Sequence, residues 1–339
     1  MCFFSKKNRL PAKMFSTLVS WLETFTTKKT RFDGGSFNVG MDFLIGGPLP
    51  IQGLCSLVQS YGTGLEGCCT KVIRGHTAEV TALAALPDGQ LASGSNDKTV
   101  RIWADMCCVL VMKGHTGGIT SLAALLDGNV ASGSVDTTVR FWNTATGACL
   151  SVMKMHRSPV YALSTLLDGR LISGGNDTFR CISDIKSKRV SVCRGAQKGL
   201  FAIALLPNGD IATSLGDDSI TVWGGRPFTL SGFADSVRAL TVLPDGKIVS
   251  GSLDKTIIVW KDGKAQYSCR GNFGAVHALC VLNGQLVSGT ADATVSIWDE
   301  DGSRLLAMAG HSKDVMALAL LFDGTLASAS KDCTIRIWR

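Results

Sequence analysis

The sequence is short of the features that mark membrane, metal and nucleotide-binding proteins. It contains no apolar run near the ~20 residues that a membrane-spanning helix needs. None of its twelve cysteines forms a C-x-x-C pair, which argues against a zinc site. The phosphate-loop pattern G-x-x-x-x-G-K-[ST] and the metalloprotease pattern H-E-x-x-H are both absent. We therefore expect neither a metal nor a cofactor.

A secretory signal pattern is also absent, so we interpret the cysteines as reduced thiols of an intracellular protein. We expect a cytoplasmic protein, with the nucleus as the alternative.

Most of the positive charge lies at the N-terminus. The formal net charge is +7, and residues 1–32 supply seven Lys and Arg against Glu23 alone, a net +6. The rest of the chain has 27 basic and 26 acidic residues, a net +1. A near-neutral body lacks the basic stripe that nucleic acids require, so we expect no nucleic-acid partner.

One short pattern is written seven times along the chain. "LASGSNDKTVRIW" at 91–103 returns at 130–142, 248–260, 286–298 and 326–338, with looser copies at 171–183 and 211–223. Each copy is rich in Val, Ile, Leu and Thr in short alternating runs, which is typical of β-strands. An Asp-Gly or Asn-Gly pair precedes every copy and predicts a hairpin with a type I′ turn. These pairs begin at Asp88, Asp127, Asp168, Asn208, Asp245, Asn283 and Asp323.

The repeat length predicts a propeller. The aspartate of the second turn recurs every 37 to 41 residues, and four strands fit one period, which describes a propeller blade. The last copy stops at Trp338-Arg339, after its third strand, whereas residues 68–74, "CCTKVIR", resemble the fourth strand "CCVLVMK" at 107–113. We predict an all-β, seven-bladed propeller over residues 68–339, whose strand 68–74 completes the last antiparallel blade.

The repeats resemble WD40 (β-transducin) repeats over residues 68–339. The resemblance implies a buried His–Ser/Thr–Asp–Trp hydrogen-bond tetrad in each complete blade. It is incomplete where Ser183 replaces Trp and where Ala196, Phe233 and Asn272 replace His, which predicts easier opening of blades four to six. Three copies are complete: His76, Ser93, Asp97 and Trp103; His115, Ser132, Asp136 and Trp142; His311, Ser328, Asp332 and Trp338.

A His–Ser–Asp set also suggests a catalytic triad. A hydrolase, however, needs one exposed nucleophile beside one oxyanion hole, whereas this set recurs at equivalent positions of a ring. We interpret the tetrads as structural hydrogen bonds and expect no enzyme.

WD40 relatives commonly grip peptides with residues beside the first strand and the second turn, on the top face. Here those positions include aromatic and basic side chains of the types that dominate binding hot spots. The alternative is that they only line the central channel, and His277 is equally well explained as a satisfied channel residue. We predict a monomeric propeller that binds a protein or peptide, acidic with an apolar anchor, through Tyr161, Phe201, Arg238, His277 and Lys331.

Residues 1–33 form a basic leader with apolar residues at helical spacing, followed by a glycine-containing linker at 34–67. The leader would pack on the propeller, bind a partner's groove, touch an anionic membrane surface weakly, or direct organellar import. "LPAKMFSTLVSWLE" at 10–23 faintly resembles the start of an F-box. The expected function is therefore an interaction scaffold, with a ubiquitin-ligase substrate receptor as the alternative.

Overall fold

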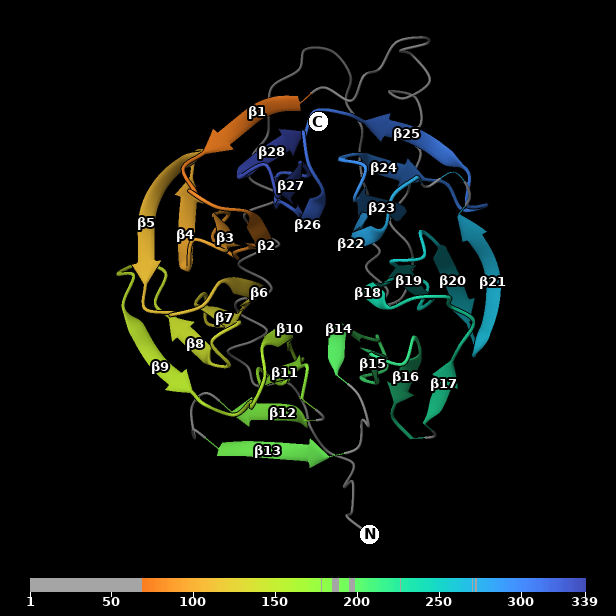
Figure 1. Ribbon diagram of the computed structural model, residues 1–339, viewed down its shortest axis with the longest axis horizontal. Coiled ribbons are helices and arrows are strands. Elements are labelled where there is room, and N and C mark those ends of the chain that lie inside the picture. Colours follow the sequence, from red (N-terminus) through yellow and green to blue (C-terminus); the bar gives the residue numbers. More distant parts are fainter. Residues whose placement is uncertain are drawn as a thin grey trace, which may run out of the picture. The chain divides into compact units, whose positions relative to one another are not determined.

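The predicted propeller is confirmed. The computed structural model describes residues 69–177, 179–184, 189–194, 199–225, 227–269, 271 and 273–339, all within the unit Tyr61–Arg339. They form seven four-stranded antiparallel sheets arranged as blades around a central axis (Figure 1). We name the strands of a blade a to d from the axis outward.

Blades 1 to 3 consist of strands β2 to β13, which follow β1 in the chain. Blade 1 consists of β2 (Val80–Ala85), β3 (Leu91–Ser95), β4 (Thr99–Ala104) and β5 (Cys107–Lys113). Blade 2 consists of β6 (Ile119–Ala124), β7 (Val130–Ser134), β8 (Val139–Trp142) and β9 (Cys149–Met153). Blade 3 consists of β10 (Val160–Thr165), β11 (Leu171–Gly175), β12 (Phe179–Asp184) and β13 (Arg189–Arg194).

Blades 4 to 7 follow in chain order. Blade 4 consists of β14 (Leu200–Leu205), β15 (Ile211–Leu215), β16 (Ile220–Trp223) and β17 (Phe228–Leu230). Blade 5 consists of β18 (Val237–Val242), β19 (Ile248–Ser252), β20 (Ile257–Lys261) and β21 (Lys264–Cys269). Blade 6 consists of β22 (Val276–Leu282), β23 (Gln285–Thr290), β24 (Val295–Trp298) and β25 (Arg304–Met308). Blade 7 consists of β26 (Val315–Leu320), β27 (Leu326–Ser330), β28 (Thr334–Trp338) and β1 (Cys69–Arg74).

The ring closes as the sequence predicts. Strand β1 pairs antiparallel with β28, with Cys69 opposite Trp338 and Arg74 opposite Thr334. The first described strand thus becomes the outer strand of the last blade, and no blade is left with three strands (Figure 1). Closure pairs both ends of the described chain with each other, so β28 has a hydrogen-bonded neighbour on each side.

The hairpins between strands a and b correct one prediction. Only in blade 6 do both turn residues, Asn283 and Gly284, have positive φ angles, as a type I′ turn requires. In the other six blades only the glycine does: Gly89 has a φ of 88° and its N–H donates to the carbonyl of Leu86 at 2.9 Å. That geometry is a three-residue loop with a bulged glycine, since one more residue separates the two strands.

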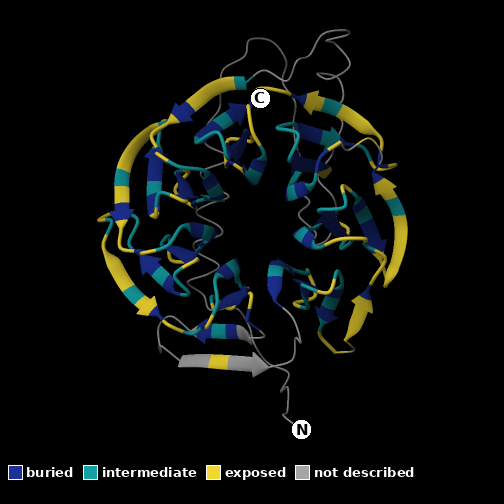
Figure 2. Ribbon diagram, viewed as in Figure 1, coloured by how far each residue is buried: buried dark blue, intermediate teal, exposed yellow. Residues whose placement is uncertain are grey.

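The core lies between neighbouring blades. One apolar cluster joins Leu86, Val100 and Ile102 of blade 1 to Ile119 and Trp142 of blade 2. Strand b is buried on both sides and strand d is mostly exposed (Figure 2). The recurring glycine of strand b permits this contact, because a Cβ on Gly94 would lie 2.4 Å from Ile119 Cγ2. Close approach of the next blade therefore explains the glycine in "SGS".

The connections define two faces. The d-to-a connections and the b-to-c turns form the top face, and the a-to-b hairpins and c-to-d turns form the bottom face. No helix in the described part of the chain is long and apolar enough to cross a membrane. The eight cysteines whose side chains are described are all free thiols.

Candidate functional site

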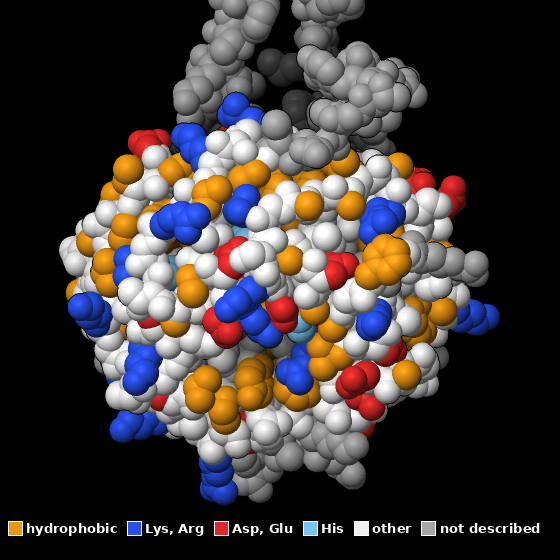
Figure 3. Space-filling model, turned by 45° about the horizontal axis from the view of Figure 1, so that its top comes forward, with side chains coloured by type: hydrophobic (Ala, Val, Ile, Leu, Met, Phe, Trp, Pro, Cys, Tyr) orange, Lys and Arg blue, Asp and Glu red, His pale blue; other side chains and the backbone are white. Residues whose placement is uncertain are grey.

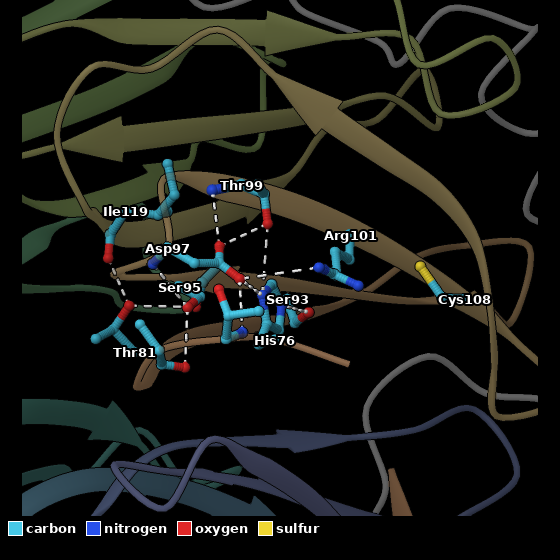
Figure 4. A network of polar contacts seen from close by, with 12 residues as sticks. His76, Thr81, Ser93, Ser95, Asp97, Thr99, Arg101, Cys108 and Ile119 are labelled. Carbon is cyan, nitrogen blue, oxygen red and sulfur yellow. Dashed lines mark hydrogen bonds and ion pairs between the residues drawn. The ribbon is translucent and has the colours of Figure 1, made fainter. Parts of the chain in front are cut away.

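The predicted tetrads form in blades 1, 2 and 7. In blade 1, His76 Nδ1 donates to Asp97 Oδ2 at 2.8 Å, since a carboxylate only accepts (Figure 4). The Ser93 hydroxyl donates to His76 Nε2 and accepts from Trp103 Nε1, both at 2.7 Å. Blades 2 and 7 repeat these contacts within 0.1 Å.

Burial decides the charge state of the tetrads. It lowers the pKa of His76, although the adjacent Asp97 carboxylate opposes the shift, and His115 and His311 behave alike. Burial alone would raise the pKa of Asp97, but hydrogen bonds from Thr99 and His76 outweigh it and lower the pKa to about 2. Each complete tetrad therefore holds a neutral imidazole beside an ionised carboxylate at neutral pH.

The tetrads are buried, so a substrate cannot easily reach them. Ser93, Ser132 and Ser328 are fully buried, as are the side chains of their histidine partners. The geometry satisfies buried polar groups that would otherwise cost about 1–3 kcal/mol each.

Blades 3 and 5 show what replaces a missing member of the tetrad. His156 in blade 3 still bonds Asp177 and Ser173, but Ser183 occupies the tryptophan position and donates to the carbonyl of Leu171 at 3.4 Å. In blade 5, Phe233 packs against Trp260 with ring centroids 5.6 Å apart, where a histidine would stand.

The serine of blade 5 responds to the lost histidine. Ser250 still accepts from Trp260 at 2.8 Å but donates to the carbonyl of Ile258 at 3.2 Å. Without the histidine, the hydroxyl turns to its own sheet. The substituted positions Ala196 and Asn272 lie outside the described residues.

A β-bulge in every a-strand places the predicted top-face residues. In β10 the ladder shifts between Val160 and Ala162, which leaves Tyr161 in the bulge. A bulge frees one residue from strict pairing and re-aims its side chain. The same shift places Phe201, Arg238 and His277. The sequence pattern located these positions without predicting the bulge.

Three of the predicted residues stack across successive blades. The rings of Tyr161 and Phe201 are 5.4 Å apart, and Arg238 Cζ lies 3.9 Å from the centre of the Phe201 ring. We call Tyr161, Phe201 and Arg238 the top-face stack.

The other two predicted residues meet an aspartate that sequence reasoning missed. Lys331 Nζ lies 2.6 Å from Asp314 Oδ2, and His277 Nε2 lies 3.5 Å from the same oxygen. Burial lowers the pKa of His277 despite Asp314, which keeps the imidazole neutral near pH 7. Asp314 precedes the first a-strand residue of blade 7, so its place in the repeat could have indicated it.

The contacts of His277 and Lys331 with Asp314 change the net charge expected for the five predicted top-face residues. Asp314 compensates Lys331, and His277 is neutral, so the positive charge beside the aromatic rings comes from Arg238. In the described residues, the Arg238 guanidinium has no ion pair, and its buried Nε has no hydrogen-bond partner.

The stack borders the mouth of the central channel. Tyr161, Arg238 and His277 line a cavity of about 210 Å³, together with Thr81 and Met316. Figure 3 shows basic, acidic and histidine side chains gathered near the middle of one face, beside hydrophobic ones. Lining the channel and offering a binding surface are therefore compatible roles for the same residues.

Two groups of predictions stay outside this geometry. The leader, the linker and the F-box-like segment lie outside the described residues, and their roles stay predictions. Among the described residues, no group of His, Cys, Asp and Glu could hold a metal ion.

Comparison with known proteins shows which known proteins the repeats are similar to. The family model described as "WD domain, G-beta repeat" matches residues 67–104, 106–143, 225–261 and 302–339. A search of curated proteins found no match. Among solved structures, the crystal structure of the WD40 beta propeller domain of Doa1 matches with a TM-score of 0.73 and 24% identity, covering 80% of this chain and 96% of that chain. With 1589 matching chains of solved structures, likeness of fold alone does not select a function.

Proposed function

The chain carries WD40 repeats, and on this premise we propose that it is a non-catalytic scaffold that binds a protein or peptide at its top face. The observation that carries the proposal is the Arg238 guanidinium, held over Phe201 without an anionic partner in the described residues. A cation beside two aromatic rings is the composition of an interface hot spot.

The stack favours a particular chemistry. A guanidinium binds a carboxylate with two parallel hydrogen bonds, and its stacking on Phe201 fixes its orientation before binding. Tyr161 and Phe201 add half-exposed apolar surface directly beside the charge. The preferred partner is a peptide with one acidic side chain next to an apolar anchor. Only one cation of the patch is uncompensated, so a strongly acidic tract gains little over a single carboxylate.

Burial of the tetrads supports the absence of catalysis. Their serine hydroxyls are inaccessible and already hydrogen-bonded on both sides in blades 1, 2 and 7. A nucleophile needs an oxygen that a substrate can reach, and these buried serines do not meet that condition.

The test compares the full chain with the double variant Phe201→Ala, Arg238→Ala. Partners captured from cell extract are identified, and the one that the double variant loses is purified and titrated against both proteins. We expect the dissociation constant of the double variant to be at least tenfold larger, since hot-spot truncations typically cost more than about 1.4 kcal/mol.

A matched control changes the same bulge positions elsewhere in the ring. Thr81→Ala, Thr120→Ala alters blades 1 and 2 and should leave the affinity within twofold. Equal binding by all three proteins would refute the top-face stack as the working surface. Turnover that disappears in the stack variant would instead establish an enzyme.

A further inference from the structure

The bottom face of blades 4 and 5 carries a pocket of unusual composition. Its volume is about 310 Å³, and Leu206, Val222, Leu230 and Ile248 supply apolar walls. Two aromatic side chains, Phe228 and Trp260, complete them. Two carboxylates, Asp210 and Asp262, also line it. Aromatic walls with carboxylates suit a cationic side chain that has an aliphatic stem.

Asp210 breaks a pattern seen in the neighbouring hairpins. Two residues after the first hairpin aspartate, blade 3 has Arg170 and blade 5 has Lys247, each paired with that aspartate at 2.7 and 2.8 Å. Blade 4 reads Asn208-Gly209-Asp210, so an acid stands where its neighbours have a base. Within the described residues, the Asp210 carboxylate accepts a side-chain hydrogen bond only from the Asn208 amide, at 2.8 Å.

The pocket is therefore anionic and unneutralised within the described part of the chain. Neither Asp210 nor Asp262 has a Lys, Arg or His within ion-pair distance there. Gly224 leaves space for the Asp210 carboxylate, because a Cβ on Gly224 would overlap its Oδ1. Phe228 lines the pocket and is 40% exposed, and a Cβ added at Gly263 would lie 3.7 Å from its ring.

An apolar groove adjoins this pocket toward the axis. It has a volume of about 360 Å³ and shares Leu206 and Pro207 with the pocket as a common wall. Leu167, at its edge, is 66% exposed, the second largest exposure of a large apolar side chain in the described residues. The groove runs across consecutive hairpins and is lined by Leu167, Leu205, Leu206, Pro207, Val242, Leu243, Pro244 and Val281.

From this arrangement we propose that the pocket and the groove form one peptide-binding site, which takes an arginine or lysine flanked by apolar residues. The basic side chain enters between Phe228 and Trp260 and meets Asp210 and Asp262. The apolar residues lie across Leu206 and Pro207 in the groove. Charge complementarity selects this occupant, since an acidic or purely apolar segment would leave both carboxylates unpaired.

This site is independent of the proposed top-face function. It lies on the opposite face and prefers a partner of opposite charge. The two sites together would let one propeller hold an acidic and a basic segment at once.

The test uses the full chain and a set of synthetic nine-residue peptides. Each peptide carries one arginine at a fixed distance from a leucine pair, and a matched peptide carries uncharged citrulline in its place. We expect the best arginine peptide to bind at least tenfold more tightly than its citrulline match. Asp210→Asn and Phe228→Ala should each weaken arginine-peptide binding at least tenfold.

Two controls separate this site from the rest of the surface. Asp168→Asn removes a bottom-face carboxylate that is already paired with Arg170, and should leave binding within twofold. The top-face variant Phe201→Ala, Arg238→Ala should also bind normally. Equal binding of citrulline peptides, an unaffected Asp210→Asn variant, or no binding by any arginine peptide overturns the proposal.

Discussion

Blades 1 and 2 use the bulge of strand a differently from blades 3 to 5. In blades 1 and 2 the bulged residue is a threonine whose hydroxyl donates to the backbone of the next blade. Thr81 bonds the carbonyl of Ile119 at 2.5 Å, and Thr120 bonds that of Val160. In blades 3 to 5 the same position holds Tyr161, Phe201 and Arg238, which contact one another instead.

The tetrads divide along the same line. They are complete in blades 7, 1 and 2 and lack a member in blades 3 and 5, as far as the described residues show. The complete tetrads are concentrated on one side of the ring, and the residues that we propose for binding, Tyr161, Phe201 and Arg238, lie on the other. Local departures from a structural rule are expected at functional sites. Functional regions also tend to have lower local stability.

The largest expected effect is a difference between two matched serines. Ser132→Ala in blade 2 leaves both His115 Nε2 and Trp142 Nε1 without a partner. Ser250→Ala in blade 5 leaves one side-chain donor, Trp260 Nε1, without its acceptor and removes the hydrogen bond to the backbone carbonyl of Ile258. We expect losses of about 2–4 and about 1–2 kcal/mol in the free energy of unfolding, because each buried unpaired group costs about 1–3 kcal/mol.

Denaturant titration of both variants and the parent protein measures this difference. Binding of the top-face partner should be unchanged in Ser132→Ala, which serves as a check on the native fold. Equal losses in the two variants would show that the histidine adds nothing to a tetrad.

Blade-by-blade stability should differ at neutral pH. The backbone amides of strands b and c in blade 5 should exchange hydrogen at least tenfold faster than those of blades 1, 2 and 7. A difference of about 1.4 kcal/mol in local opening, close to one buried hydrogen bond, gives that factor. Hydrogen exchange read by mass spectrometry measures it, and uniform protection around the ring would remove the contrast.

Lowering the pH should reduce the difference in hydrogen-exchange protection between blade 5 and blades 1, 2 and 7. The pKa values of His76, His115 and His311 are lowered in the fold, so the open state binds more protons once the pH falls below about 6.5. The stabilisation of these blades is complete above that pH and is lost as the pH falls toward the folded pKa. Phe233 has no proton to gain, and the lowered pKa of Asp254 acts only below about pH 4.

Exchange at pH 7.5 and 5.5, corrected for the intrinsic rate, tests this sign. We expect protection in blades 1, 2 and 7 to fall several-fold at the lower pH, while protection in blade 5 stays constant. A parallel decrease in all four blades would mean that the tetrad histidines do not govern the change.

The fold was readable from the sequence because it is repeated. Seven hairpin pairs in register fix the strands, and "CCTKVIR" at 68–74 indicated the closing strand, observed as Cys69–Arg74. The type I′ prediction was wrong in six hairpins, because the residue before Asp-Gly also belongs to the loop. Dipeptide chemistry identifies a turn, but loop length decides its type.

The candidate site was less predictable, because it depends on contacts between blades. Repeat position placed Phe201 and Arg238 on one face, yet their stacking arises only when neighbouring bulges aim both side chains at each other. Asp314, which compensates Lys331, is 17 residues away in sequence, and only the coordinates show that the two side chains pair. Identifying which charged side chains pair with each other requires the structure, whereas the positions of residues within the repeat can be identified from the sequence alone.

The smallest effect concerns the threonine bonds themselves. Thr120→Val keeps the shape of the side chain but removes the hydroxyl that donates to the carbonyls of Gly133 and Val160. We expect a loss of about 1 kcal/mol, since one side-chain hydrogen bond typically contributes about 0.5–1.5 kcal/mol. Tyr161→Phe provides the comparison in blade 3: it also removes one hydroxyl at a bulge position, but that hydroxyl makes no hydrogen bond to the next blade within the described residues. We expect the unfolding midpoint to decrease for Thr120→Val and to stay nearly constant for Tyr161→Phe. Equal decreases in the unfolding midpoint would mean that the bulge residue stabilises the ring in blade 3 as it does in blade 2. The Tyr161 hydroxyl would then contribute to stability and would not be free to bind a partner.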